Sequence, residues 1–158
     1  MSEDSRVFLK SELFPHDVWK EILELFLAEQ REQRGTRSRW VVPEPTVWLS
    51  VQEIGASHVQ FGRYRWQIGI HYSSSYDPMK LWVTVAIPYH CLLLMEGAVY
   101  HGPEPDGGPV IADVDEFSRY AKNFLLRRTS LQKLVKHGVM DADENLTLDR
   151  QAWRRERR

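Results

Sequence analysis

Hydrophobic residues recur every three or four positions between residues 14 and 34. The stripe consists of Phe14, Val18, Ile22, Leu25 and Phe26. This spacing places apolar side chains on one face of a helix, and Gly35 is typical of the position just after a helix C-terminus. The pattern therefore predicts an amphipathic helix over residues 14–34.

The period changes to two at residue 39, beginning with the short segment 39–42, and this period is typical of strands. The predicted strands are 46–54, 59–72, 79–87 and 92–100. Within 59–72, apolar positions such as Ile68 and Ile70 share one face, while Gln67 and His71 share the other. Pairing Ile70 with Leu81 aligns the apolar faces of two strands in one register. Because the separators are short, we expect an antiparallel four-stranded meander.

The segment 101–109 is rich in proline and glycine and predicts a loop. Helical spacing returns after Asp113 or Asp115, either of which can cap the helix, and Ser130 can start a second short helix that ends at Gly138. The expected fold class is therefore α+β, with an N-terminal helix, a four-stranded antiparallel meander, a Pro/Gly loop and C-terminal helices. We expect a single domain over residues 1–149 and an arginine-rich basic tail over 150–158.

The chain has 158 residues, of which 42% are hydrophobic and 27% charged, as in globular domains. Its formal net charge of -1 provides no general attraction to nucleic acid, which is not the expected partner. No apolar run approaches the roughly 20 residues of a membrane span, and the first residues are too acidic for a signal peptide. We therefore expect a cytoplasmic protein without membrane association.

Two patterns of metal-ligand residue types occur, and neither fits a site. Oxygen ligands alternate through Asp141–Asp149, but Leu146 replaces the glycine of a calcium loop and Ala152 its bidentate glutamate. Three histidines lie at predicted strand ends: His71, His90 and His101. The predicted strand order puts two of them at one edge of the sheet and the third at the other, unlike a zinc site. We predict no metal and no cofactor.

The single cysteine, Cys91, follows His90, and a neighbouring base can activate a thiol. These two residues are the alternative catalytic site, whereas a buried apolar cysteine is the simpler interpretation. The second face of the predicted sheet is too apolar to be fully solvated. The residues proposed to bind there, or in the following loop, are Trp82, Leu94, Tyr100, His101, Arg63 and Arg65. This face predicts a protein partner or a homodimer.

The order of elements is similar to that of ubiquitin-conjugating enzymes and the related RWD domains. Residues 71–85, HYSSSYDPMKLWVTV, fall into step with the family passage H/x-F-P-x-x-Y-P-x-x-P-P and its following strand, although only Pro78 of the prolines is kept. Tyr89 and His90 match the family's Tyr-His-Pro-Asn. Gly97 stands seven residues after the histidine, as in the family's Gly-x-Ile-Cys.

Two departures affect the chemistry of that family. Tyr100 stands where the family has its nucleophilic cysteine, and Cys91 and Leu92 replace the Pro-Asn after the histidine. The resemblance therefore implies a non-catalytic binding or scaffold subunit of a protein complex, with a ubiquitin-like protein as one conceivable partner. Two alternatives stay open: a divergent thiol-dependent conjugating enzyme that uses Cys91, and an RNA-contacting subunit that uses the arginine-rich tail.

Overall fold

The structure is a computed structural model that describes residues 2–54, 64–73, 76–103 and 108–156. In this part of the chain, one antiparallel sheet contains seven strands in the order β2-β3-β4-β5-β1-β6-β7. The strands are β1 (Ser2–Leu9), β2 (Glu29–Arg34), β3 (Arg37–Val42), β4 (Val47–Glu53), β5 (Trp66–Ser73), β6 (Val99–His101) and β7 (Val110–Ile111). The helices are α1 (His16–Leu25), α2 (Pro78–Leu94), α3 (Val114–Arg128), α4 (Leu131–Lys136) and α5 (Arg150–Glu156).

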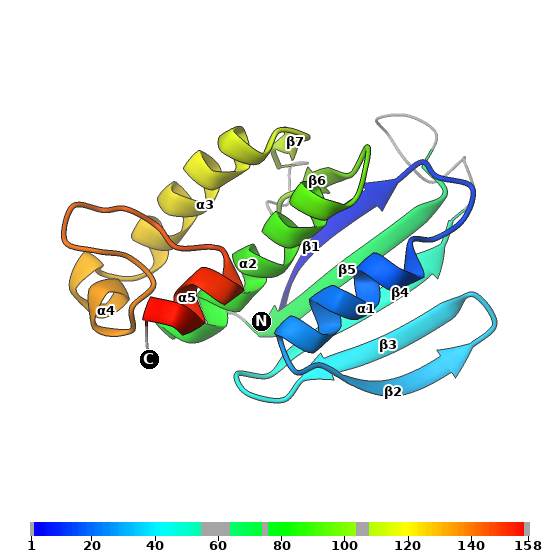
Figure 1. The fold of residues 1–158 in the computed structure, drawn as a ribbon, viewed down its shortest axis with the longest axis horizontal. Helices are drawn as coiled ribbons and strands as arrows, with labels where there is room; N and C mark the ends of the chain where they lie inside the picture. Colours follow the sequence, from blue (N-terminus) through cyan, green and yellow to red (C-terminus); the bar gives the residue numbers. More distant parts are fainter. Residues whose placement is uncertain (1, 55–63, 74–75, 104–107, 157–158) are drawn as a thin grey trace.

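The helices α1 and α2 cover one face of the sheet, as Figure 1 shows. The core lies between them and the inward-facing positions of the central strands. These positions alternate along each strand and are all buried: Val7, Leu9, Val47, Leu49, Val51, Ile68 and Ile70. α3 packs beside α2, and Trp153 of α5 stacks on Trp82 of α2. The sheet is therefore covered by helices on one side only in the described part of the chain.

The predicted four-stranded meander is wrong, because residues 79–87 and 92–94 belong to the helix α2. The apolar run alternates like a strand, but it is apolar on every side, and such a run forms a fully buried helix equally well. Asp77 caps the helix by accepting a hydrogen bond from the Met79 N–H, and Pro78 occupies the first turn. The register that paired Ile70 with Leu81 therefore does not exist. Residues 71–85, which carried the family resemblance, run from β5 into α2.

The predicted helix over 14–34 is too long, because α1 ends at Leu25. Residues 29–34 form the edge strand β2, which pairs with β3. Their side chains are polar and suit a helix by propensity, so pairing with β3 overrides the local preference. Gly35, with φ +56°, serves the turn between β2 and β3 and does not end a helix.

The strand β1 was not predicted, although it is central to the sheet. It pairs with β5 over its whole length and with β6 through Arg6–Phe8. Its sequence contains five polar residues before Val7, which concealed the alternation. β1 replaces the segment 79–87 as the neighbour of β5.

Other local predictions are confirmed. β3 and β4 lie within two residues of the predicted 39–42 and 46–54. In β5 the predicted apolar face, including Ile68 and Ile70, is buried, whereas residues 59–63 of that prediction lie outside the described residues. Asp113 caps α3 and Ser130 caps α4, and Gly138 adopts φ +72° after the second helix.

Candidate functional site

The face of the sheet opposite α1 and α2 carries a polar cluster. We call it the open face, and its central residues are Asp4, Arg6, Arg39, Trp48, Ser50, Gly69 and His71. They form two rows across the strands. One row runs Arg39–Ser50–Gly69–Arg6, and the other places Trp48 and Asp4 on either side of His71. Each of these positions neighbours a core position, so the strand period turns it outward.

A hydrogen-bonded chain of three side chains crosses this face. The Nδ1 of His71 lies 2.7 Å from the Oδ1 of Asp4, and its Nε2 lies 3.1 Å from the Oγ of Ser50. An ionised carboxylate only accepts hydrogen bonds, so Nδ1 carries the proton facing Asp4. In the neutral ring, Nε2 is then the acceptor, and the Ser50 hydroxyl donates to it. The side chains of His71 and Asp4 are 40% and 45% exposed, so this chain is open to solvent.

Gly69 makes room for the contact between Ser50 and His71. A Cβ at this position would lie 2.6 Å from both the Oγ of Ser50 and the Nε2 of His71. Real Cβ atoms do not approach other atoms so closely, so any larger residue would push the two side chains away. A glycine inside a central strand weakens the strand and often marks a close approach of other groups. Here the close approach is the Ser50–His71 hydrogen bond.

A groove of about 480 Å³ begins at His71 and continues past Trp48. It is lined by Arg39, Thr46, Trp48, His71, Tyr72, Ser73 and Lys80. The guanidinium of Arg39 lies over the Trp48 ring, 5.1 Å from its centroid, and the Nζ of Lys80 donates to the Ser73 Oγ at 3.0 Å. Among the described residues of the lining there are two cations and no carboxylate. Two acids contact lining residues, since Glu32 lies 3.8 Å from Arg39 and Asp4 binds His71.

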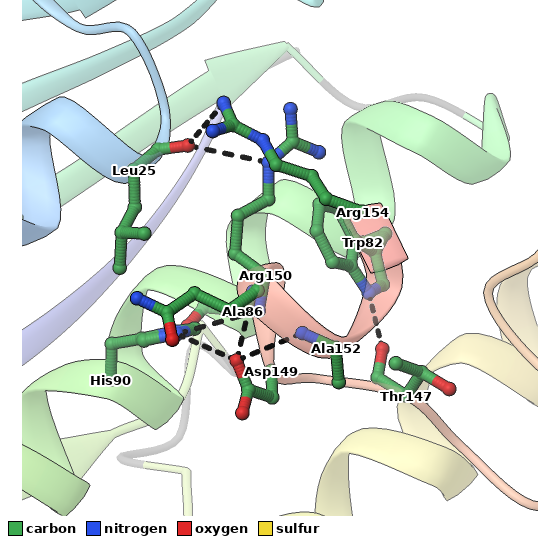
Figure 2. A network of polar contacts seen from close by, with 10 residues as sticks. Leu25, Trp82, Ala86, His90, Thr147, Asp149, Arg150, Ala152 and Arg154 are labelled. Carbon is green, nitrogen blue, oxygen red and sulfur yellow. Dashed lines mark hydrogen bonds and ion pairs between the residues drawn. The ribbon is translucent and has the colours of Figure 1, made fainter. Parts of the chain in front are cut away.

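The other histidine of interest, His90, lies in a closed network on the helical side of the sheet (Figure 2). Its Nδ1 donates to the Ala86 carbonyl at 2.8 Å, and its Nε2 accepts from the Arg150 N–H at 3.5 Å. Burial lowers the pKa of His90, an effect that the backbone bond to Ala86 and the charge of Asp149 oppose. Both ring nitrogens are therefore engaged, and the ring is held neutral.

The adjacent Cys91 is fully buried in the core, and burial raises the pKa of its thiol. A nucleophilic cysteine needs an accessible thiolate, whereas this thiol is kept protonated and away from substrates. The pair Cys91 and His90 is thus arranged for packing.

The arginine-rich segment from residue 150 begins with helix α5, two of whose arginines contact the rest of the protein. Arg150 and Arg154 both donate to the Leu25 carbonyl at the end of α1, as Figure 2 shows. Cations are favoured at a helix C-terminus, where carbonyl groups lack partners. The Arg150 guanidinium also lies 4.4 Å from the Trp153 ring centroid and 5.3 Å from that of Trp82. Burial, followed by the charge of Arg154, lowers the pKa of Arg150 to about 10.

The predicted binding residues are not brought together. Trp82 and Tyr100 are 0% and 2% exposed and belong to the core, whereas Leu94 at the end of α2 is 43% exposed. His101 pairs with Arg6 across β6 and β1, beside the open face. The remaining two are arginines: Arg65 binds Glu53 at 3.1 Å, and Arg63 lies outside the described residues.

Sequence reasoning missed the cluster of Asp4, Ser50 and His71. Asp4 belongs to a strand that was not predicted, and its contact with His71 joins residues far apart in the sequence. One local signal was available, because Gly69 interrupts an apolar strand two residues before a histidine.

Comparisons with known protein families, with curated proteins and with solved structures found no match. Among the described helices, none is long and apolar enough to cross a membrane. The described residues also contain no group of three or more His, Cys, Asp or Glu side chains placed to hold a metal ion. Functional interpretation therefore depends on the geometry of the open face.

Proposed function

We propose that this protein binds an acidic segment of a partner protein in the groove of the open face. The observation that supports this proposal is the lining of the groove, where the described residues include Arg39, Lys80 and Trp48 but no carboxylate. A carboxylate of the partner pairs with either cation, and an apolar or aromatic side chain packs on the Trp48 ring. Aromatic and arginine residues are the types most often responsible for affinity at interfaces.

The shape and charge of the face favour a protein segment over nucleic acid. Asp4 and Glu32 border the groove and limit the number of negative charges that it can accept, which disfavours the continuous phosphate backbone of RNA or DNA more than a segment with a few carboxylates. Two of the arginines that suggested RNA binding are used elsewhere, because Arg150 and Arg154 hold α5 against α1. The resemblance to ubiquitin-conjugating enzymes stays a prediction, and the groove is defined without it.

We also propose that the protein acts in the cytoplasm, as expected from the sequence. Its single cysteine, Cys91, is a free thiol, which suits a reducing compartment.

The test measures fluorescence anisotropy of a labelled decapeptide with alternating Glu and Phe residues. We expect the protein to bind it, with an affinity that falls as salt is added. Lys80→Glu and Arg39→Glu each replace attraction with repulsion, and each should raise Kd about tenfold or more, which corresponds to about 1.4 kcal/mol.

The matched control is Lys133→Glu, which makes the same charge change at an exposed lysine on α4. It should leave Kd unchanged. A decapeptide of alternating Lys and Phe should bind poorly. Failure of the Glu-Phe peptide to bind, equal effects of Lys80→Glu and Lys133→Glu, or stronger binding of an oligouridine RNA would each refute the proposal.

A further inference from the structure

A second feature of the open face lies beside the groove. Asp4, His71 and Ser50 form a chain in which a carboxylate orients an imidazole and the imidazole accepts a hydrogen bond from a hydroxyl. This is the arrangement that activates a serine for nucleophilic attack, because the base removes the hydroxyl proton as the new bond forms. The distances of 2.7 and 3.1 Å are within the range required for both contacts.

Gly69 distinguishes these three hydrogen-bonded side chains from ordinary polar pairs on a sheet surface. The missing side chain of Gly69 allows the His71 ring to reach Ser50 on the next strand.

An arginine stands on each of the two strands that flank Ser50 and Gly69. Arg39 is the neighbour of Ser50 across β3 and β4, and Arg6 is the neighbour of Gly69 across β5 and β1. The backbone N–H groups of the central strands are directed toward neighbouring strands and do not face a molecule lying on the sheet. A negative charge that develops on a substrate oxygen would therefore have to be stabilised by side chains, and Arg39 and Arg6 are the cations on the adjoining strand positions.

From this geometry we infer that Ser50 is the nucleophile of an esterase activity, with His71 as general base and Asp4 as the residue that positions His71. The Ser50 Oγ attacks the carbonyl carbon of a carboxylic ester, and its proton passes to the Nε2 of His71. The bond to the alkoxy group breaks, and that group leaves as the alcohol with the proton from His71. Water then attacks the acyl-serine by the same route, which releases the carboxylic acid and restores Ser50.

This inference goes beyond the proposed binding of an acidic segment and does not depend on it. The experiment treats the full chain with a fluorophosphonate, in which the Ser50 Oγ displaces fluoride from phosphorus. Intact mass and peptide mapping then locate the adduct, and hydrolysis of p-nitrophenyl acetate gives the turnover. We expect one adduct on Ser50 and none in Ser50→Ala.

Two further substitutions distinguish activation of the Ser50 hydroxyl by His71 from simple exposure of that hydroxyl to the reagent. His71→Gln should slow labelling about a hundredfold or more, since general base catalysis contributes about 10²–10⁴-fold. Gly69→Ala retains all three reacting side chains, but its Cβ separates Ser50 from His71 and should slow labelling at least about tenfold.

Asp4→Asn tests the positioning role, because asparagine can hold the ring in the tautomer that lacks an acceptor at Nε2. Its labelling rate should fall while circular dichroism and the unfolding midpoint stay near those of the parent protein. Ser11→Ala changes an exposed serine that follows β1 and should have no effect.

Two results would overturn the inference. One is an adduct that forms at Ser11 as fast as at Ser50. The other is labelling of Ser50 at the same rate in the parent, His71→Gln and Gly69→Ala proteins. Neither result would affect the peptide-binding proposal, which is measured without the fluorophosphonate.

Discussion

The two histidines His71 and His90 both engage Nδ1 and Nε2, but their surroundings are opposite. Each uses Nδ1 and Nε2, His71 toward Asp4 and Ser50, and His90 toward Ala86 and the Arg150 N–H. The His71 side chain is 40% exposed, whereas that of His90 is 4% exposed. His71 contacts two side chains that a ligand can reach, while His90 joins backbone groups of two packed helices. The difference indicates function on the open face and stability in the α5 network.

The largest expected difference between the two regions is in the free energy of unfolding when one tryptophan is removed from each. Trp82→Ala deletes a ring that is fully buried, stacks on Trp153 at 5.2 Å and donates to the Thr147 carbonyl. It should reduce the free energy of unfolding by about 3–5 kcal/mol. Trp48→Ala removes a half-buried ring from the open face and should cost about 1 kcal/mol or less.

Denaturant unfolding measures both free energies. If Trp82→Ala does not fold, Trp82→Phe provides the measurement, because it retains most of the packing and loses the hydrogen bond. Equal losses from Trp48→Ala and Trp82→Ala would remove the distinction between the two regions.

The next effect concerns the role of the arginines in α5. Arg150→Ala loses the hydrogen bond to Leu25 and the contacts with three aromatic rings, and it should cost about 2 kcal/mol. Arg155→Ala changes the same residue type at an exposed position of the same helix and should stay within about 0.5 kcal/mol. A thermal shift assay compares the two variants. Equal melting temperatures of the two variants would mean that the Arg150 side chain is solvated and does not stabilise the fold.

The smallest effect is the dependence of stability on pH that His90 produces. Burial sets its folded-state pKa below that of the unfolded chain, which is about 6.5. As pH falls from about 6.5 toward the folded-state pKa, the unfolded chain binds more protons, so the free energy of unfolding decreases. Because His90 binds a single proton, the free energy of unfolding can change through it by at most about 1.4 kcal/mol per pH unit.

His90→Gln removes this titration, and its free energy of unfolding should change less with pH between 6.5 and 5. The measurement is a series of denaturant unfolding curves over this range. An unchanged slope in the variant would assign the pH dependence to another group.

Local signals in the sequence predicted only part of the fold. The caps Asp113 and Ser130 located α3 and α4, since a capping side chain acts on the backbone two or three residues away. The run from Met79 to Leu94 was assigned to strands because alternation cannot distinguish a buried helix from a strand. Its length and the cap at Asp77 with Pro78 were the signals that favoured a helix.

The candidate site was less predictable than the fold. Alternation in β5 placed His71 on the polar side of the sheet, and that prediction is confirmed. Its partners could not be identified in the same way, because Asp4 and Ser50 reach His71 through strand pairing between distant segments. Strand order and register depend on the packing of the whole sheet, so no local pattern specifies them.

The central position of β1 also has a consequence for how the protein folds. β1 comes first in the chain, yet Leu9 pairs with Trp66, Ser2 with Ser73 and Val7 with Tyr100. Its pairing must wait until most of the chain is available, and closing such long loops costs entropy before the contacts form. During synthesis, β3, β4 and β5 can pair before β1 has both its neighbours. Folding should therefore be slow for a chain of this size, with docking of β1 as a late step.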